Sequence, residues 1–528
     1  MITGKNYIGN SLSNLGSETF KTFNPKLNIE NEWTFHEASD SEINKAVSLA
    51  TDAFDDYKNT SGKERAIFLN QIADEIETLG DELMQVYCQE TGLPEGRAKG
   101  ERGRTVGQLR SFAALVDEGS WVQATIDTSL PERVPMPKPD LRKMMIPLGP
   151  VAVFGASNFP LAYSTAGGDT ASALASGCPV VVKSHPMHAG TGELVASAII
   201  KAVVKTNMPN GIFSNLNSSG IEVGEKLVSH PNIKAVGFTG SIKGGRALLD
   251  MATEREEPIP VFAEMGSVNP VVLLPKALEL KTKNWAKTYA GSITLGAGQF
   301  CTNPGLLFGI RGDGLTTFMN ELAKEILKIQ PFCMLNPAIK NNYSTNKSFI
   351  QEQNGVSTVA TEEEREDNFG NQAVVSVSGA EFIANPSLHR EVFGPFSMIV
   401  QCEDNIELEN AINSLEGQLT GTVISEEDEI KDFSQTIALL QSKVGRLIFN
   451  GVPTGVEVCP AIQHGGPYPA STDSRFGAVG IHSINRWVRP ISFQDWPNNL
   501  LPDELRDENP LKINRSVNGV STKETITR

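Results

Sequence analysis

Residues 151–160 read VAVFGASNFP, and this stretch decides the fold class. Four apolar residues closed by Gly155 are typical of a short buried strand that runs into a helix. The pattern recurs along the chain, with strands expected at 180–183, 212–216, 235–239 and 259–264 and helices at 161–176, 190–205, 222–229 and 242–253. Strands that alternate with helices indicate βαβ units, so the sequence predicts an α/β protein with a parallel sheet. Such sheets bind ligands at the carboxyl ends of their strands.

The regions on either side of this core have patterns of their own. Upstream, helical spacing of apolar residues predicts helices at 41–56, 61–78, 80–91 and 101–117. The prolines of 131–139 exclude a central strand and favour an edge ribbon or a linker arm. Beyond Gly266, a second alternating region is predicted to contain strands at 271–274 and 398–401 and helices at 284–295, 316–329 and 405–415. The acidic run 361–368 is interpreted as a solvated face.

Composition excludes several classes of protein. The 528 residues carry 46 Lys and Arg against 62 Asp and Glu, a formal charge of −16, which argues against nucleic acid or an acidic membrane as the main partner. Six cysteines without a CxxC pair give no disulfide scaffold, and no HExxH spacing indicates a catalytic metal. The chain begins without the pattern of a signal peptide and contains no apolar stretch of membrane-spanning length. We therefore expect a reduced, cytoplasmic protein with no membrane partner.

Three polar residues stand where chemistry is expected. Asn158 and Glu264 each follow an apolar strand, and Cys301 lies in a turn between Gly298 and Pro304. Taken singly, Asn158 has an alternative as a helix cap and Cys301 as a buried structural thiol. Together with a helix start at Gly240 and Ser241 that suits a phosphate, they make a set that fits oxidation of a carbonyl.

Six motifs in order carry a resemblance to a known family. They are Ser157-Asn158-Phe159-Pro160, Val181-Val-Lys183, Gly237-Phe-Thr-Gly240-Ser241, Glu264-Met-Gly266, Gly298-Gln-Phe-Cys301 and Glu391-Val-Phe393-Gly-Pro395. With these the chain resembles the NAD(P)-dependent aldehyde dehydrogenase superfamily over nearly its whole length. The stretches 183–188 (KSHPMH) and 463–469 (QHGGPYP) resemble a branch that contains α-ketoglutaric semialdehyde (2,5-dioxopentanoate) dehydrogenases and a bacterial fatty aldehyde dehydrogenase.

The resemblance implies a catalytic role for each of the three polar residues. Cys301 would attack the aldehyde, and the Asn158 amide with the Cys301 N–H would hold the oxyanion. Glu264 would activate water to hydrolyse the resulting thioester. A dicarboxylic semialdehyde also needs a cation for its distal carboxylate. Arg475 is the candidate, with an ion pair to Asp473 as the alternative.

The resemblance also implies where the cofactor binds. Lys183 and Ser184 would lie near the adenosine ribose or its phosphate, and Gly240 and Ser241 near the pyrophosphate. The nicotinamide end would meet two further residues, Glu391 at the ribose and Phe393 at the ring. Pro186 replaces a glutamate common in members that prefer NAD, and loss of that charge favours NADP, with NAD as the alternative.

The resemblance implies a fold with two parallel-sheet domains and an arm. We assign residues 1–129 and 148–265 to a Rossmann-like cofactor domain, 266–484 to a catalytic domain, and 130–147 with 485–528 to an oligomerisation arm. A homodimer or homotetramer is expected, with a small aldehyde as substrate. The preferred reaction converts α-ketoglutaric semialdehyde to 2-oxoglutarate. The alternatives are a fatty or aliphatic aldehyde dehydrogenase, a cofactor-independent cysteine thioesterase or hydrolase, and a non-catalytic relative.

Overall fold

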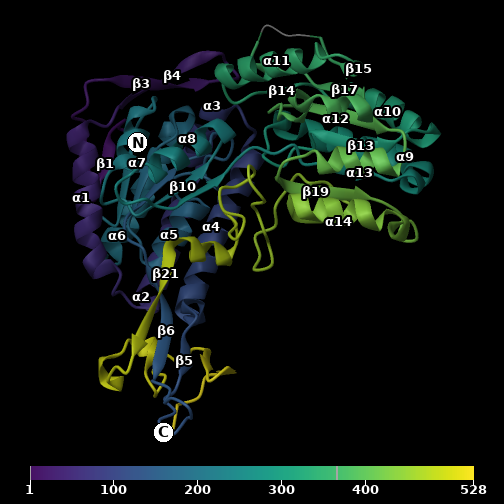
Figure 1. Cartoon of the computed structure of the whole chain (residues 1–528). Coiled ribbons are helices and arrows are strands. Elements are labelled where there is room, and N and C mark those ends of the chain that lie inside the picture. The colour runs from purple at the N-terminus through teal and green to yellow at the C-terminus, as the bar shows by residue number, and fades with distance from the viewer. Residues whose placement is uncertain (1, 364–366, 528) are drawn as a thin grey trace.

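The computed structural model describes residues 2–363 and 367–527 and contains the predicted parallel sheet (Figure 1). Its strand order is β11-β10-β7-β8-β9-β1-β2. The five parallel strands are β7 (Val151–Phe154), β8 (Val180–Lys183), β9 (Phe213–Leu216), β10 (Ala235–Thr239) and β11 (Val261–Glu264). All five match predicted strands within two residues. Two short antiparallel strands that were not predicted, β1 (Asn6–Ile8) and β2 (Ser11–Ser13), extend one edge.

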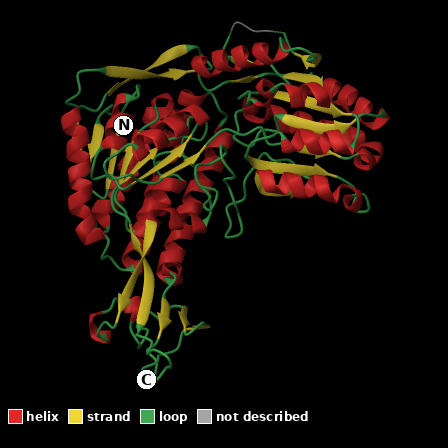
Figure 2. Ribbon diagram, in the orientation of Figure 1, coloured by secondary structure: helices red, strands yellow, loops and turns green. Residues whose placement is uncertain are grey.

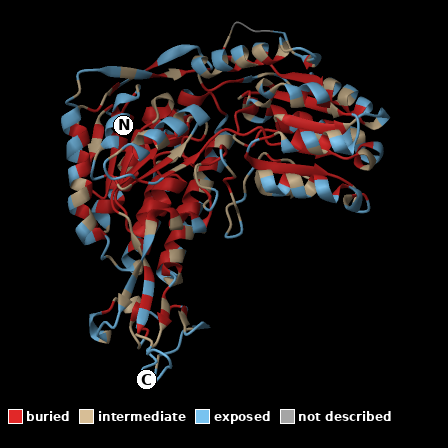
Figure 3. Ribbon diagram, in the orientation of Figure 1, coloured by how far each residue is buried: buried red, intermediate tan, exposed pale blue. Residues whose placement is uncertain are grey.

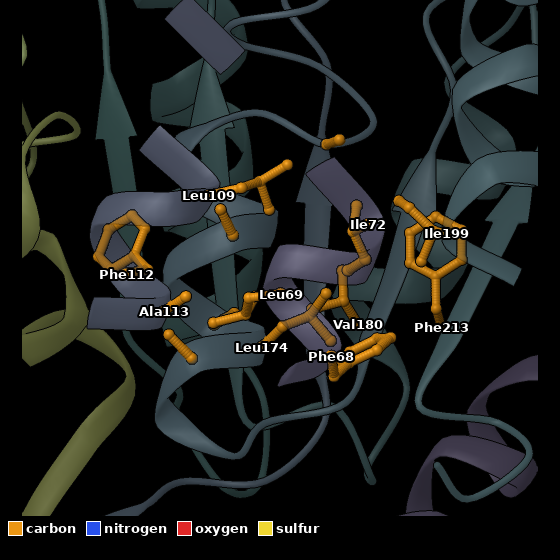
Figure 4. Packing of buried hydrophobic residues seen from close by; sticks show 14 of the residues in the cluster. Phe68, Leu69, Ile72, Leu109, Phe112, Ala113, Leu174, Val180, Ile199 and Phe213 are labelled. Carbon is orange, nitrogen blue, oxygen red and sulfur yellow. The ribbon is translucent and has the colours of Figure 1, made fainter. Parts of the chain in front are cut away.

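Helices cover both faces of this sheet. The crossovers are α5 (Gly168–Ser176), α6 (Ala189–Lys205), α7 (Glu222–Ser229) and α8 (Ile242–Thr253), and the upstream helices are α1 (Asp40–Tyr57), α2 (Gly62–Thr78), α3 (Gly80–Thr91) and α4 (Glu95–Glu118). Figure 4 shows side chains of α2 and α4, among them Phe68 and Phe112, packed with Leu174 of α5 and Val180 of β8. Residues of the five parallel strands are mostly buried (Figure 3).

The first crossover differs from the prediction. The helix expected over 161–176 begins only at Gly168, and residues 161–167 form turns. Glu101 of α4 accepts hydrogen bonds from the N–H groups of Leu161 (2.8 Å) and Ala162 (2.9 Å). The Glu101 side chain therefore accepts from two N–H groups that would have no partner in the first turn of a helix. Sequence periodicity does not predict this contact.

The second region forms another seven-stranded sheet, ordered β15-β17-β18-β13-β12-β19-β20. Its strands are β12 (Val271–Leu273), β13 (Leu306–Ile310), β15 (Ser357–Thr361), β17 (Ala373–Ser378), β18 (Phe396–Cys402), β19 (Gln418–Ile424) and β20 (Val444–Phe449). Every neighbouring pair is parallel except β15 with β17. The longer helices around it are α9 (Pro275–Thr294), α10 (Asp313–Ile326), α11 (Pro337–Gln351), α13 (Asn405–Asn413) and α14 (Ser434–Lys443).

Two predictions for this region need correction. The helix expected at 284–295 begins earlier, at Pro275, because proline suits the first turn of a helix. The helix is kinked at Lys281 but continues through this residue. The acidic run 361–368 falls partly outside the described residues, since 364–366 are not described. Of its described members, Glu363 is exposed but Asn368 is buried and donates to the carbonyl of Met334.

A third sheet projects from the body of the molecule (Figures 1 and 2). Its order is β21-β6-β5-β22-β23, from β5 (Thr125–Asp127), β6 (Leu141–Pro147), β21 (Val488–Gln494), β22 (Arg515–Val517) and β23 (Val520–Thr522). Residues 131–139 form turns with an isolated bridge between Leu130 and Lys138, so the exclusion of a central strand there is confirmed. The strand β6, which was not predicted, follows this segment and pairs with strands on both sides. The strand begins after the last proline of 131–139, so its N–H groups remain available. The domain boundaries given above remain our proposed division of the chain.

One helical stretch has the length and composition of a membrane span. It runs from Pro186 to Lys205 and contains α6. Within the molecule, 72% of its most apolar window is buried, and α6 packs against α2 and α3. The apolar residues are therefore explained as the core of the first sheet.

Arg142 of β6 is expected to hold the projecting sheet together. Its side chain is 1% exposed, donates to Asp140 (2.8 Å), Asp507 (2.7 Å) and the carbonyl of Leu505 (2.5 Å), and joins β6 to the C-terminal segment. Arg142→Met should lower the free energy of unfolding by about 3–5 kcal/mol, because two carboxylates lose a buried partner. Chemical denaturation measures the change. Arg110→Met removes an exposed ion pair and should cost less than about 1 kcal/mol; equal losses in both variants would contradict the role of Arg142.

Candidate active site

The loop that carries Cys301 follows α9 and has an unusual backbone. Gly296, Ala297 and Gly298 have φ of 55°, 57° and 65°, in the left-handed region. A Cβ on Gly298 would lie 2.2 Å from the carbonyl oxygen of Gly394. Only glycine permits so close an approach. This approach brings the loop of Cys301 against the segment of Glu391 and Phe393.

Asn269 fixes the other side of the same loop. Its buried side-chain amide donates to the carbonyls of Cys301 (2.8 Å) and Asn303 (2.9 Å), and its oxygen accepts from Thr420 (2.9 Å) and Ser267 (3.1 Å). Sequence reasoning missed this residue. The available signal was a polar side chain beside an apolar strand, which also marked Glu264.

Cys301, Glu264 and Asn158 come together as predicted, although 37 residues separate the thiol from the carboxylate in sequence. Glu264 ends β11, and its carboxylate oxygen lies 3.0 Å from Nε2 of His464. That nitrogen is 3.6 Å from the Cys301 sulfur. The Asn158 amide donates to the carbonyl of Gln299 (3.1 Å), two residues before the cysteine. The amide is thus held against the cysteine loop.

Burial controls the protonation of this cluster. It raises the pKa of Glu264 to about 8, with a further increase from the Asp169 charge and opposing effects of Arg486 and Arg104. Burial also raises the pKa of Cys301 well above its usual range, and the charges of Glu264 and Glu391 add to this effect. The pKa of His464 falls to about 3 because of burial and the nearby Arg104 and Arg446. At neutral pH the site therefore holds a thiol, a largely protonated carboxyl and a neutral imidazole.

The same three side chains are of the types that ligate zinc. The ligand atoms of Glu264, Cys301 and His464 all lie within 4.8 Å of one another. No local spacing in the sequence joins them, so a search for metal motifs does not find this group. Among the described residues, this three-ligand cluster was not expected from the sequence.

Two cavities meet at Cys301. The first, of about 210 Å³, is the cofactor-side cavity, and the second, of about 320 Å³, is the aromatic cavity. The cofactor-side cavity is lined by Ala156, Ser157, Asn158, Thr239, Gly240, Ser241, Glu264, Met265, Gly266, Cys301, Ile339, Asn342, Asn346, Glu391 and Phe393. The aromatic cavity is lined by Gly96, Arg97, Gly100, Glu101, Arg104, Phe159, Tyr163, Phe300, Cys301, Thr302, Gly455, Val456 and His464. The thiol thus reaches two separate binding spaces.

The cofactor-side cavity has the features of a dinucleotide site. Ser241 caps α8 by accepting from the N–H of Gly244 (3.1 Å), so a helix start with its partial positive charge borders the cavity. Glu391 lies over Gly266, where a Cβ would come 2.3 Å from its carboxylate. Burial raises the pKa of Glu391 to about 7. The helix start at one end of the cavity fits a pyrophosphate, and the Glu391 carboxylate at the other end fits the hydroxyl groups of a ribose.

Three predicted site residues line neither cavity. Lys183 is half-buried and donates to the carbonyl of Ser218 (3.0 Å). Ser184 is 1% exposed and packs beneath α6, where a Cβ on Gly192 would lie 3.2 Å from its hydroxyl, so it turns away from the cavity. Arg475 is 78% exposed and forms an ion pair with Asp473 (2.5 Å). The alternative given for Arg475, an ion pair with Asp473, is therefore correct. Asp473 lies two residues before Arg475 and binds its guanidinium at the surface.

Arg97, Arg104, Tyr163 and His464 line the aromatic cavity and were not predicted as site residues. The two arginines lie seven residues apart on α4, more than 190 residues before Cys301 in sequence. Their helical spacing was visible in the sequence. What they face depends on how α4 packs against the other elements.

Solved structures show the same fold. Betaine aldehyde dehydrogenase from Staphylococcus aureus, in complex with NAD+, superimposes with a TM-score of 0.80 at 19% identity, covering 94% of this chain and 96% of that one. A 1-pyrroline-5-carboxylate dehydrogenase from Thermus thermophilus gives 0.78 at 20% identity, covering 93% and 92%. At such identities the likeness concerns the fold.

Sequence comparison goes further. The chain is 46% identical to α-ketoglutaric semialdehyde dehydrogenase 2 of Azospirillum brasilense and 44% identical to α-ketoglutaric semialdehyde dehydrogenase of Acinetobacter baylyi, covering 98% of this chain and 99% of each relative. Residues 13–487 match the family model described as "Aldehyde dehydrogenase family". Because this model matches most of the chain and both relatives are more than 30% identical over nearly its full length, the chain belongs to the aldehyde dehydrogenase family.

Proposed function

We propose that this NAD(P)-dependent aldehyde dehydrogenase oxidises α-ketoglutaric semialdehyde to 2-oxoglutarate through a thioester on Cys301. The observation that carries the reaction is the position of Cys301, which is a lining residue of both the cofactor-side cavity and the aromatic cavity. The substrate is proposed from the two relatives with 44–46% identity over almost the full chain.

The first half of the reaction forms a bond from sulfur to carbon. The Cys301 thiol first loses its proton to solvent, which reaches the residue through the two cavities that it lines. The Cys301 sulfur then adds to the aldehyde carbon, and negative charge passes to the aldehyde oxygen. The Asn158 amide and the Cys301 N–H donate to that oxygen; one such donor is worth about 3 kcal/mol of barrier.

Bound NAD+ or NADP+ supplies the hydride acceptor. Gly240, Ser241 and the start of α8 would hold its pyrophosphate, and Glu391 its nicotinamide ribose, with Phe393 beside the ring. The carbon held by Cys301 becomes a thioester. Glu264 then removes a proton from water, the water oxygen attacks the thioester carbon, and the sulfur takes up that proton as it leaves, so that the carboxylate is released and Cys301 returns to a thiol.

The structure offers arguments for both cofactors. Lys183 donates to the carbonyl of Ser218 (3.0 Å), and burial lowers its pKa to about 8. The charges of Glu37 and Glu222 oppose that shift, so two carboxylates act on the lysine expected near a 2′-phosphate. We propose that the enzyme accepts NADP+ as well as NAD+, and that Glu222 limits the preference for NADP+ that Pro186 favours.

We also propose a homo-oligomer in the cytoplasm. The strand β20 forms an edge of the second sheet, with Leu447 (41%) and Phe449 (47%) exposed. Exposed apolar edges are unfavourable unless another strand or chain covers them. The projecting sheet is the candidate partner from a second copy.

Replacing the nucleophile tests the proposed chemistry. Cys301→Ala should reduce NAD(P)H formation, followed at 340 nm, by more than about 10³-fold, because no thioester can form. Cys88→Ala removes a half-buried thiol of α3 outside both cavities and should keep the wild-type rate. Acid formation without reduced cofactor would instead support a cysteine hydrolase.

Glu264 should set the pH dependence of the steady rate. Because a general base works only when deprotonated and burial raises its pKa to about 8, the wild-type rate should rise up to that pH and level off above it. Glu264→Gln should keep the burst of NAD(P)H but slow the steady rate at least about 100-fold and remove that rise. Stopped-flow measurement separates the two phases. A steady rate like that of the wild type would remove Glu264 from the hydrolysis step.

The cofactor proposal is tested at one carboxylate. Glu222→Gln should raise the ratio of kcat/KM for NADP+ over NAD+ by roughly fivefold, since one exposed unit charge contributes about 1 kcal/mol at contact distance. Glu225→Gln removes an equivalent charge from the same helix and should leave the ratio unchanged. Equal ratios in the wild type and Glu222→Gln would show that Glu222 does not act on cofactor choice.

A further inference from the structure

The aromatic cavity is cationic in a chain that is strongly acidic overall. The formal charge of the chain is −16, yet the cavity contains two guanidinium groups, from Arg97 and Arg104, and a single carboxylate, from Glu101, among its described lining residues. An anion is thus the ligand that the charges of this cavity would attract.

Arg97 and Arg104 lie on one face of α4. Residues seven apart on a helix point in the same direction, and Gly100 lies between the two arginines on that face. Cβ atoms built on Gly96 and Gly100 would meet no atom within 4 Å. These glycines therefore relieve no clash. They leave open the space in front of the two guanidinium groups, although glycine is less favourable than alanine within a helix.

The carboxylate of Glu101 is already occupied. It accepts from the N–H groups of Leu161 (2.8 Å) and Ala162 (2.9 Å) and from the hydroxyl of Tyr87 (2.6 Å). Its contact with Arg97 is longer, 3.5 Å to Nε. The Arg97 guanidinium lies 4.3 Å from the ring centre of Phe159 and 4.8 Å from that of Phe300, which hold it at the wall of the cavity.

Arg104 has hydrogen-bond donors without an acceptor among the described residues. One of its terminal nitrogens donates to the hydroxyl of Tyr163 (2.8 Å), and its buried Nε has no hydrogen-bond partner. Within residues 2–363 and 367–527, Arg104 forms no ion pair with a carboxylate. The buried Nε is closed to a ligand, but the second terminal nitrogen donates to no group of the described residues and is not among the buried atoms, so a bound carboxylate can accept from it.

We propose that Arg104, assisted by Arg97, binds the distal carboxylate of the substrate and selects a short dicarboxylic semialdehyde over an aliphatic aldehyde. This inference rests on the proposed function. Cys301 lies in the lining of the same cavity, so the aldehyde end meets the thiol while the other end meets the arginines. Phe159, Phe300 and Val456 contact the methylene groups between them. A long alkyl tail would instead desolvate the arginines without offering them an acceptor.

The test compares two aldehydes of the same chain length. The kcat/KM values for α-ketoglutaric semialdehyde and for pentanal are measured with saturating NAD+, and their ratio is the readout. Arg104→Met should lower the ratio at least about 30-fold, mainly through KM, because a desolvated carboxylate loses its partner. Arg104→Lys should recover only part of the ratio, since an ammonium group lacks the planar fork. Arg97→Met should lower it to a smaller degree.

Arg102→Met is the matched control. Arg102 lies on the same helix, carries the same charge and is not in the lining of the cavity, so its loss should leave the ratio unchanged. A ratio that stays constant in both Arg104 variants, or falls equally in Arg102→Met, overturns the assignment.

A measurement on the wild-type enzyme tests the same assignment if the variants do not fold. The methyl ester of the semialdehyde keeps its shape but loses the charge, and its kcat/KM should be at least about 30-fold lower than that of the free acid. An ester as good as the acid overturns the assignment without any mutation. A wild-type enzyme that oxidises pentanal but not the semialdehyde would contradict the proposed substrate itself, which is a different result.

Discussion

The active site depends on a close approach of two backbones. Gly298, before the nucleophile, lies against Gly394 at a distance that leaves no room for a side chain. A similar approach at Gly266 places the Glu391 carboxylate directly on the backbone after β11. These contacts join the carboxyl end of one sheet to loops of the other. Cys301 therefore lies between the cofactor-side cavity and the aromatic cavity, and the chemistry follows from this position.

Burial supplies the second constraint. Burial raises the pKa of both Glu264 and Cys301, and the charge of Glu264 raises the pKa of the thiol further, so both retain protons at neutral pH. Beneath them, Asp169 and Arg486 form a buried ion pair at 2.7 Å, and these two charges act on Glu264 in opposite directions. Trp487, the next residue, donates to Ser172 (2.7 Å) and leads into β21. The base of the projecting sheet is thus attached to the floor of the active site.

Much of the first sheet was predictable from sequence. Strands such as β10 and helices such as α7 and α8 match their predicted bounds, because apolar runs and turn residues act locally. The errors occur where a distant group decides the conformation. Glu101 binds the N–H groups of Leu161 and Ala162 in the turns of 161–167, and β6 is an interior strand because β5 and β21 pair with it. Ser184 and Arg475 had suitable chemistry, but packing and a local carboxylate direct them elsewhere.

The sequence by itself determined the α/β class, the family resemblance and the candidate roles of Cys301, Glu264 and Asn158, because these depend on local patterns and on motifs in a fixed order. Only the tertiary structure decided what surrounds them. His464 reaches the thiol, Asn269 holds its loop, and two arginines of α4 face the same cavity from the N-terminal part of the chain. The physical reason is distance along the chain. Contacts between residues hundreds of positions apart arise from the packing of whole elements, and no local pattern records them.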